Sequence, residues 1–353
     1  MSTSIRYMDQ TLGAGMKKGL PTAVISLMAQ ELSGLPVAGM DISFAQLTEY
    51  EHALAGFRQL LRVRVSSSVQ EIAAVYSRGV ASVTFIYEHS SGRTITAELE
   101  NALNKALQLG MKSSLAITNA SVLSVEEVTT IIQQIRGAGL DSLIYCDSSS
   151  RFDPFMAFAA ISEIKKRISC SLEFHGANQF GLATANALSA IQAGAQRIGT
   201  AVAGVGTPGC AAWEEVLLSN RFLLESPVEL NDGLSKRCAV ILAAMEEELA
   251  VDKAVIGDNI FAHESGLHIF GIQKDPRIYE PFPPEAVGLE RYLIVGRHSG
   301  TTSLQIVLQE QGIQVHSTVL QRMLKQVRQA VLTRKRPLRS AEVLELCLSG
   351  QAV

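Results

Sequence analysis

Short apolar runs alternate with longer amphipathic stretches along most of the chain. The short runs are bounded by Gly, Ser, Asn or Asp and predict eight strands: Ile5–Asp9, Val37–Ile42, Leu61–Val65, Ala81–Tyr87, Ser113–Thr118, Asp141–Cys146, Cys170–His175 and Gln196–Val202. The stretches between them repeat apolar residues at helical spacing, and three end in Gly110, Gly139 and Gly194. This alternation predicts parallel strands joined by right-handed helical crossovers.

Eight such repeats before about residue 220 favour one α/β architecture, a TIM (β/α)8 barrel, over an open doubly wound sheet. The open sheet remains the alternative. Its phosphate-binding signature GxGxxG is missing, because Gly13-Ala-Gly15 is followed by Met-Lys-Lys-Gly. We expect the barrel to occupy residues 1–255.

The pattern changes after the predicted barrel. A helix is expected over Asp232–Ala250, followed by an irregular segment, residues 256–300, that is rich in Gly, His, Pro and aromatic residues. A loop of this length is usually functional. Helical periodicity returns over Thr301–Glu310, Thr318–Leu332 and Ser340–Leu348. Residues 256–353 are therefore predicted to form a lid segment and a small, mainly helical region.

Composition excludes several classes of protein. Of 353 residues, 47% are apolar and 18% charged, which excludes a disordered chain. With a net charge of -3, the chain has no overall positive charge to attract nucleic acid or an anionic membrane. Its longest apolar segments are too short to span a membrane. The five cysteines are scattered without a CxxC pair, and the first residues do not read as a signal peptide. We expect reduced thiols and a cytoplasmic location.

Chemistry in such a barrel is expected at the carboxyl ends of the strands. Asp9, Asp147 and His175 are the strongest candidates there for metal binding or proton transfer, although each is equally consistent with a structural polar group. A second cluster, His263 to His268, lies in the irregular segment. It lacks the HExxH zinc motif and suits general acid–base chemistry better, with packing by hydrogen-bonded histidines as the alternative.

Several motifs together resemble one family. Phe261-Ala-His-Glu-Ser-Gly-Leu-His268 and Gly296-Arg-His-Ser-Gly300 resemble the post-barrel segment of homocitrate synthases of the nitrogenase-cofactor type. The resemblance continues in Asp9-Gln-Thr-Leu12, in Cys146-Asp147-Ser148 and in Leu182–Gly194, and covers nearly the whole chain. These enzymes belong with isopropylmalate synthase and hydroxymethylglutaryl-CoA lyase.

The resemblance implies a Claisen condensation of acetyl-CoA with a 2-oxo acid held by a divalent cation (Mg²⁺, Mn²⁺ or Zn²⁺). It also implies a dimer in which the post-barrel segment reaches the partner's barrel. His268, with His263, would then be catalytic in trans. The residues expected to contact the substrate are Asp9, Asp147, Ser148, Asn178 and Ser299.

The chain departs from the family at the reaction centre. The family's Arg after the first strand is Gly13, and the metal-binding Asp after it is Ala14. One of two histidines on the seventh strand is Ala177, and the Asn after the eighth strand aligns with Cys210. Of the four expected metal ligands, only His175 remains, so metal binding and transition-state stabilisation are both expected to be impaired.

Three hypotheses follow. The first is a homocitrate-synthase-like protein without metal chemistry of its own, acting as a partner or regulatory subunit in a heterodimer with an intact paralogue. The second is an active acyltransferase with an altered site and a homocitrate-type or isopropylmalate-type product; the expected dimer itself is either a homodimer or a heterodimer with an intact paralogue. The third is a non-catalytic protein that binds small organic acids or CoA. None involves nucleic acid or a membrane.

Overall fold

The computed structural model describes residues 4–88, 96–135, 139–231, 233–264, 271–272 and 274–349. The chain forms two compact units, Met1–Leu249 and Ala250–Val353, which we describe separately. Among the described residues, no helix is long and apolar enough to cross a membrane. Each of the five cysteines is a free thiol.

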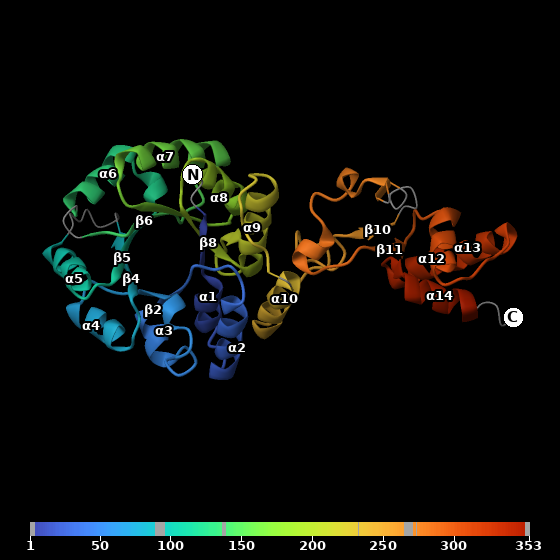
Figure 1. The fold of residues 1–353 in the computed structure, drawn as a ribbon, viewed down its shortest axis with the longest axis horizontal. Coiled ribbons are helices and arrows are strands. Elements are labelled where there is room, and N and C mark those ends of the chain that lie inside the picture. Colours follow the sequence, from blue (N-terminus) through green and yellow to red (C-terminus); the bar gives the residue numbers. More distant parts are fainter. Residues whose placement is uncertain are drawn as a thin grey trace. The chain divides into compact units, whose positions relative to one another are not determined.

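The first unit is a closed parallel barrel (Figure 1). Its strands are β1 (Arg6–Asp9), β2 (Gly39–Ser43), β3 (Leu61–Arg64), β4 (Ser82–Glu88), β5 (Lys112–Thr118), β6 (Ser142–Asp147), β7 (Ser171–Gly176) and β8 (Arg197–Ala201). Each pairs in parallel with the next, and β8 pairs with β1 in the register Arg6–Arg197 to Asp9–Thr200. This closure confirms the predicted barrel and excludes the open sheet. Each of the eight predicted strands overlaps a barrel strand.

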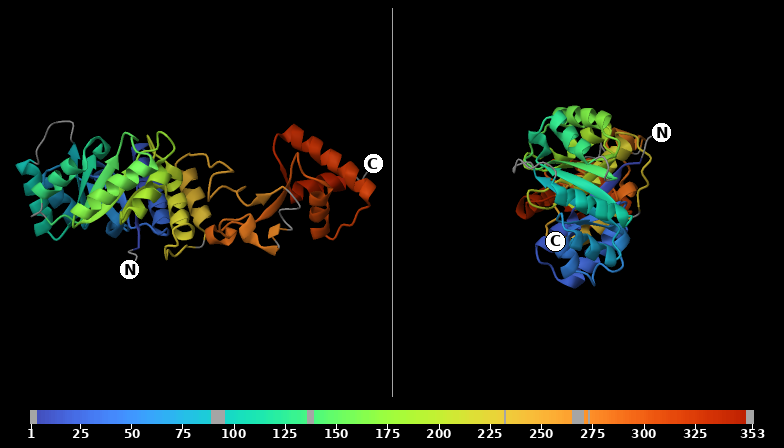
Figure 2. Two further views of the ribbon diagram at one scale, coloured as in Figure 1. Left: turned by 90° about the horizontal axis from the view of Figure 1, so that it is seen from above. Right: turned by 90° about the vertical axis from the view of Figure 1, so that its left-hand side faces the viewer.

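Helices cover the outside of the ring of strands, as the views in Figures 1 and 2 show. They are α1 (Thr11–Lys17), α2 (Thr22–Ser33), α3 (Phe44–Glu49), α4 (Val69–Ser77), α5 (Ala97–Gln108), α6 (Val125–Gln134), α7 (Pro154–Arg167), α8 (Ala183–Gln192), α9 (Trp213–Phe222) and α10 (Leu234–Ala244). Local sequence fixes several starts. Ser43 and Ser124 begin α3 and α6 with capping boxes, and Asp153 caps α7 ahead of Pro154.

Besides helix α1, which was not predicted, two details of the barrel unit differ from the sequence-based expectation. The helix predicted over Asp232–Ala250 is only α10, Leu234–Ala244, because Glu246 adopts a left-handed conformation with φ 58° that a helix cannot continue. A short strand, β9 (Ala211–Ala212), was not predicted and pairs with β8. It fixes the loop after β8, which carries Cys210, at the end of the barrel.

The described part of the second unit includes a small sheet and the helices that pack on it. Strands β10 (Ala262–His263), β11 (Tyr292–Val295) and β12 (Leu338–Arg339) form the sheet, and the helices are α12 (Thr301–Glu310), α13 (Ser317–Arg334) and α14 (Ser340–Ser349). Leu293 and Val295 of β11 pack in one apolar core with Leu304 of α12, Val327 of α13 and Val343 of α14. This unit therefore has a core of its own.

Candidate functional site

A cavity of about 630 Å³ opens at the carboxyl ends of the barrel strands. Its lining includes His175 on β7 together with Ala14, Ala177 and Cys210, the three positions where the resemblance implies further metal ligands. Ser148, after β6, also lines it. The fold therefore gathers these separated sequence positions around one cavity, but three of the four expected ligand positions carry no carboxylate, amide or imidazole.

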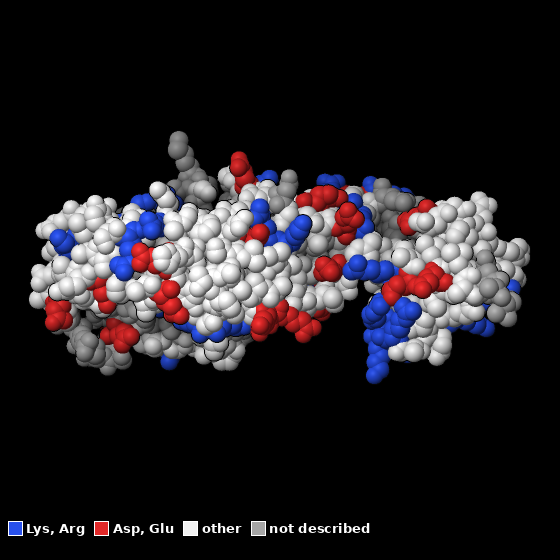
Figure 3. All heavy atoms as spheres, turned by 90° about the horizontal axis from the view of Figure 1, so that it is seen from below, with Lys and Arg blue, Asp and Glu red and all other residues white. Residues whose placement is uncertain are grey.

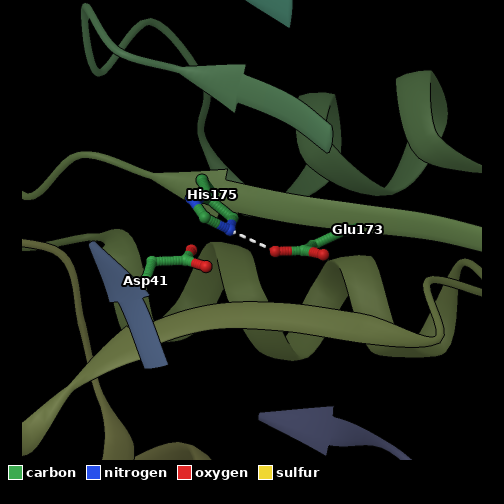
Figure 4. A group of neighbouring side chains, drawn as sticks. All are labelled: Asp41, Glu173 and His175. Carbon is green, nitrogen blue, oxygen red and sulfur yellow. Dashed lines mark hydrogen bonds and ion pairs between the residues drawn. The ribbon is translucent and has the colours of Figure 1, made fainter. Parts of the chain in front are cut away.

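A buried charge network lies beside this cavity. Arg62 on β3 donates from Nε and Nη2 to the Asp41 carboxylate on β2, at 2.5 and 2.7 Å. The same guanidinium donates from Nη1 and Nη2 to the two Glu173 oxygens, both at 2.6 Å. His175 Nε2 lies 2.5 Å from Glu173 Oε1. Figure 4 shows Asp41, Glu173 and His175 converging from β2 and β7. Arg62 thus joins two carboxylates that belong to opposite parts of the barrel.

Electrostatics hold this network in its charged form. Arg62 is 2% exposed and Glu173 is fully buried. Burial opposes the charge on both groups. The adjacent Asp41 and Glu173 carboxylates nevertheless hold the pKa of Arg62 well above its usual value. Burial likewise acts to raise the pKa of Glu173, but Arg62 and His175 bring it well below the usual range. The network is therefore a buried ion cluster in which one guanidinium stabilises two carboxylates.

The residues at this centre do not fit a divalent cation. Asp41, Glu173 and His175 are suitable ligand types, and one ligand atom from each lies within 4.8 Å of the others. Arg62, however, already donates to all four carboxylate oxygens, and His175 is hydrogen-bonded to Glu173. A cation added here would lie beside a buried guanidinium whose charge repels it.

The neighbouring residues Cys210 and Gly13 do not supply the missing metal ligand or the missing arginine. Burial, with the nearby Asp9 and Glu214 carboxylates, raises the pKa of Cys210 to about 12, so its thiol is a poor ligand at neutral pH. Gly13 lies against β2, and a Cβ atom at this position would be 2.7 Å from the Asp41 carbonyl oxygen. An arginine could not be restored at residue 13 without moving the backbone of α1 or β2.

The predicted substrate-binding carboxylates, Asp9 and Asp147, accept hydrogen bonds from nearby backbone amides and hydroxyl groups. Asp9, at the end of β1, accepts hydrogen bonds from Thr11 Oγ1 at 2.6 Å and Leu12 N at 3.0 Å, at the start of α1. Asp147, at the end of β6, accepts from Ser121 Oγ at 2.6 Å and from the amides of residues 151 and 152. Burial raises the pKa of Asp9 to about 6, against the lowering effect of its hydrogen bonds. Neither carboxylate is part of the cavity wall.

The other two predicted contacts in the barrel differ in position. Ser148 is exposed at the cavity and its hydroxyl accepts a hydrogen bond from Asn119 N at 3.4 Å. Asn178 is half-buried, and its side-chain oxygen caps α8 by accepting from Ala183 N at 3.1 Å. Of the five residues predicted to contact substrate, Ser148 is the one that lines the cavity.

Basic side chains give the cavity a positive edge. Lys17, Lys18 and Arg64 line it. Lys18 pairs with Glu247 at 2.5 Å, whereas Lys17 and Arg64 form no ion pair within the described part of the chain. Elsewhere charge is mixed: on the face in Figure 3, acidic and basic side chains are interspersed among wide uncharged areas. The cavity is therefore lined by two cationic side chains, Lys17 and Arg64, that are available to bind an anion.

In the second unit, two predicted residues contact glutamates: Ser299 contacts the backbone of Glu264, and His263 contacts the buried side chain of Glu280. Ser299 is 1% exposed; its hydroxyl accepts from Gly296 N at 2.9 Å and donates to the Glu264 carbonyl oxygen at 3.1 Å. His263 Nε2 lies 3.4 Å from Glu280 Oε1. Arg291 donates to both Glu280 oxygens, at 3.0 and 2.9 Å. His268 lies outside the described residues.

Sequence reasoning missed the central part of the barrel network. Arg62, Asp41 and Glu173 were not selected as site residues, nor were Lys17 and Arg64. The available signal was a charged residue inside a buried parallel strand, since such strands are normally continuous apolar runs. Two-residue spacing places the Arg62 and Arg64 side chains, and likewise those of Glu173 and His175, on the same face of their strands.

Two protein families match this chain. Residues 24–230 match the family described as HMGL-like, and residues 255–335 match the homocitrate synthase post-HMGL domain-like family. The first match covers the barrel from α2 to beyond α9, and the second begins shortly after the boundary between the two units.

Curated relatives are synthases. A 2-isopropylmalate synthase of Caldanaerobacter subterraneus is 33% identical over 264 residues, which cover 73% of this chain and 69% of that protein. A homocitrate synthase of a Frankia strain is 38% identical over 235 residues, which cover 66% of this chain and 58% of that protein. The HMG-CoA lyase of Brucella melitensis has a similar fold, with a TM-score of 0.58 at 17% identity, over 69% of this chain and 96% of that one.

Proposed function

We propose that this chain, which belongs to the HMGL-like family and is similar to homocitrate and isopropylmalate synthases, does not carry out the metal-dependent condensation by itself. It acts as a partner or regulatory subunit that binds a small organic-acid anion in the barrel cavity. The observation that carries the proposal is the grouping of Ala14, Ala177 and Cys210 with His175 around this cavity.

The chemistry of the centre supports loss of the metal step. The two carboxylates grouped with His175, those of Asp41 and Glu173, are already ion-paired with Arg62, and Gly13 leaves no space for the arginine that the resemblance implies. The Lewis acid and that arginine are the two groups that the resemblance implies for stabilising the negative charge that develops in the condensation, and the residues present do not provide either. His175 keeps a hydrogen bond to Glu173 and a place at the cavity, so it can orient a bound anion.

The positive edge supports anion binding. Lys17 and Arg64 line the cavity, and among the described residues no carboxylate pairs with either. Carboxylates bind well to such groups through charge-assisted hydrogen bonds. An organic acid is therefore a suitable ligand class, and its binding need not be followed by turnover.

The ordered second unit supports a role as partner. His263 and Ser299 are fixed by Glu280 and Glu264, so the post-barrel region keeps a defined arrangement while the barrel centre has lost its ligands. We propose that this region, with His263 and His268, completes the barrel of an intact relative in a heterodimer. The trans role, the dimer and the cytoplasmic location remain predictions.

Two assays on the purified protein test the proposal. Acetyl-CoA and 2-oxoglutarate are supplied with Mg²⁺ or Mn²⁺, and free CoA thiol is measured; we expect no release above background. In parallel, 2-oxoglutarate without acetyl-CoA should raise the melting temperature, because a ligand that binds only the folded state stabilises it. The Arg64→Gln variant should lose most of this shift, whereas Arg277→Gln, a surface control in the second unit, should keep it.

Steady CoA release that depends on the metal would overturn the proposal and favour an active acyltransferase. Absence of both turnover and ligand-induced stabilisation would contradict the organic-acid site. The partner role has its own test. Addition of the protein to an intact synthase paralogue should form a mixed dimer, and His268→Ala should abolish the activity gained on mixing.

A further inference from the structure

We propose that Arg62 is the resident cation of the barrel centre and that its guanidinium occupies a latent divalent-cation site formed by Asp41, Glu173 and His175. The inference rests on the proposed function, because it assumes that the natural protein binds no metal there. It adds a second reason for the absence of metal binding. Besides the loss of ligands at Ala14, Ala177 and Cys210, a cationic side chain of the protein itself occupies the site.

The three potential ligands form a compact donor set. One carboxylate oxygen from each of Asp41 and Glu173 and one nitrogen of His175 lie within 4.8 Å of one another. Two carboxylates and an imidazole suit Zn²⁺ or Mn²⁺, with water filling the remaining positions. The residues come from strands of the barrel wall, β2 and β7, so rigid elements hold them.

Arg62 occupies the position that such an ion would take. Its nitrogens lie 2.5–2.7 Å from the carboxylate oxygens of both acidic residues, and its side chain is 2% exposed. A guanidinium stays charged at every accessible pH, so protonation changes cannot open the site. Charge balance excludes a second cation: a divalent ion in place of the guanidinium would neutralise both carboxylates, whereas an ion added beside it would leave excess buried positive charge.

The ligands have supports that do not depend on Arg62. The Gln10 side-chain amide donates to Asp41 Oδ2. The His175 ring lies over Gly199 of β8, where a Cβ atom would be 2.3 Å from Nε2. Loss of Arg62 should therefore leave two of the three ligands close to their present positions, with the carboxylates uncompensated and ready to accept a cation.

The test compares Arg62→Met with the natural protein by Zn²⁺ titration calorimetry and thermal unfolding. We expect Arg62→Met to bind one Zn²⁺ roughly a hundredfold more tightly than the natural protein, since even indirect support of a metal ligand changes affinity by this order. Its melting temperature should rise when Zn²⁺ is added. The double variant Arg62→Met/His175→Gln should lose the gain, which separates this site from adventitious surface binding. Arg291→Met, which removes an arginine from a carboxylate in the second unit, is the matched control and should gain no Zn²⁺ affinity.

Arg62→Met could unfold in the absence of metal, and recovery on refolding is then the readout. Soluble, helical protein should be recovered with Zn²⁺ and not with a chelator. A variant that neither binds Zn²⁺ nor is rescued by it overturns the inference but leaves the proposed function intact. Equal, tight Zn²⁺ binding by the natural protein would instead contradict the proposed function, so the two failures are distinguishable.

Discussion

The barrel and the second unit each contain a histidine on a buried glutamate that an arginine also contacts. In the barrel the set is His175, Glu173 and Arg62; in the second unit it is His263, Glu280 and Arg291. The arginines differ in environment, because the side chain of Arg62 is 2% exposed and that of Arg291 is 38% exposed. Arg62 also holds a second carboxylate, Asp41.

The difference shows how burial decides what a similar ion cluster does. Water reaches Arg291, so if this arginine is removed, solvent can stabilise part of the Glu280 charge. Solvent cannot replace Arg62, and the barrel centre therefore depends on this one side chain for its charge balance. In such a centre all four carboxylate oxygens already accept hydrogen bonds from Arg62 and none is free to bind a metal ion, which agrees with the proposed loss of metal chemistry.

The largest effect is expected from removing each arginine in turn. Arg62→Met should lower the free energy of unfolding by about 3–5 kcal/mol, because it leaves the buried Glu173 and the partly buried Asp41 carboxylates without their cationic partner. Arg291→Met should cost about 1 kcal/mol or less. Denaturant unfolding without added metal measures both. Equal losses in the two variants would show that burial does not separate the two clusters.

The second prediction concerns Asp9, whose pKa is raised from 3.8 to about 6 by burial. The folded state then binds more protons than the unfolded state between these values, so this group lowers stability as pH rises through about 6. Relative to Asp9→Asn, the natural protein should lose on the order of 3 kcal/mol between pH 4 and pH 7. Urea unfolding at several pH values measures the difference, and parallel pH profiles for the two proteins would contradict it.

The third prediction tests the packing of His175. Gly199→Ala would place a Cβ atom 2.3 Å from the imidazole, so the ring must leave its position or β8 must shift. We expect a cost of about 1–3 kcal/mol and weaker binding of 2-oxoglutarate. Gly300→Ala in the second unit is the control, because no atom lies within 4 Å of the added methyl group. A Gly199→Ala protein as stable as this control would mean that the ring is not confined.

The smallest effect is expected at Ser299. Ser299→Ala removes a buried hydroxyl that accepts from Gly296 N and donates to the Glu264 carbonyl oxygen. The expected loss of stability is about 1 kcal/mol, typical of one hydrogen bond, with the barrel cluster unaffected. Thermal unfolding followed by circular dichroism measures the loss. A change in 2-oxoglutarate binding to the barrel cavity would contradict the separation of the two regions.

Much of the fold was predictable from the sequence. The eight strands follow from apolar runs between turn residues, and closure follows from the number of repeats, since an eighth parallel strand can pair with the first. The end of α10 was not predictable, because the left-handed conformation of Glu246 has no distinctive residue type. Helix α1 was missed because its three-residue Gly-Ala-Gly sequence resembles a loop.

The site was predictable only in part. The losses at Ala14, Ala177 and Cys210 were visible by resemblance, and the structure gathers these positions around one cavity with His175. The roles of Asp9 and Asp147 in holding nearby backbone amides could not be separated from ligand binding by residue type alone. The Arg62 network joins residues 41, 62 and 173, and only the closed barrel brings such distant positions into contact.

We propose that the barrel centre of the natural protein binds no divalent cation. The most direct measurement is the metal content of the purified protein after equilibration with Mg²⁺, Mn²⁺ and Zn²⁺ and removal of free ions. We expect no bound ion at the barrel centre, and therefore the same metal content in the natural protein and in His175→Gln. One equivalent of metal that is retained by the natural protein and lost in His175→Gln would contradict it.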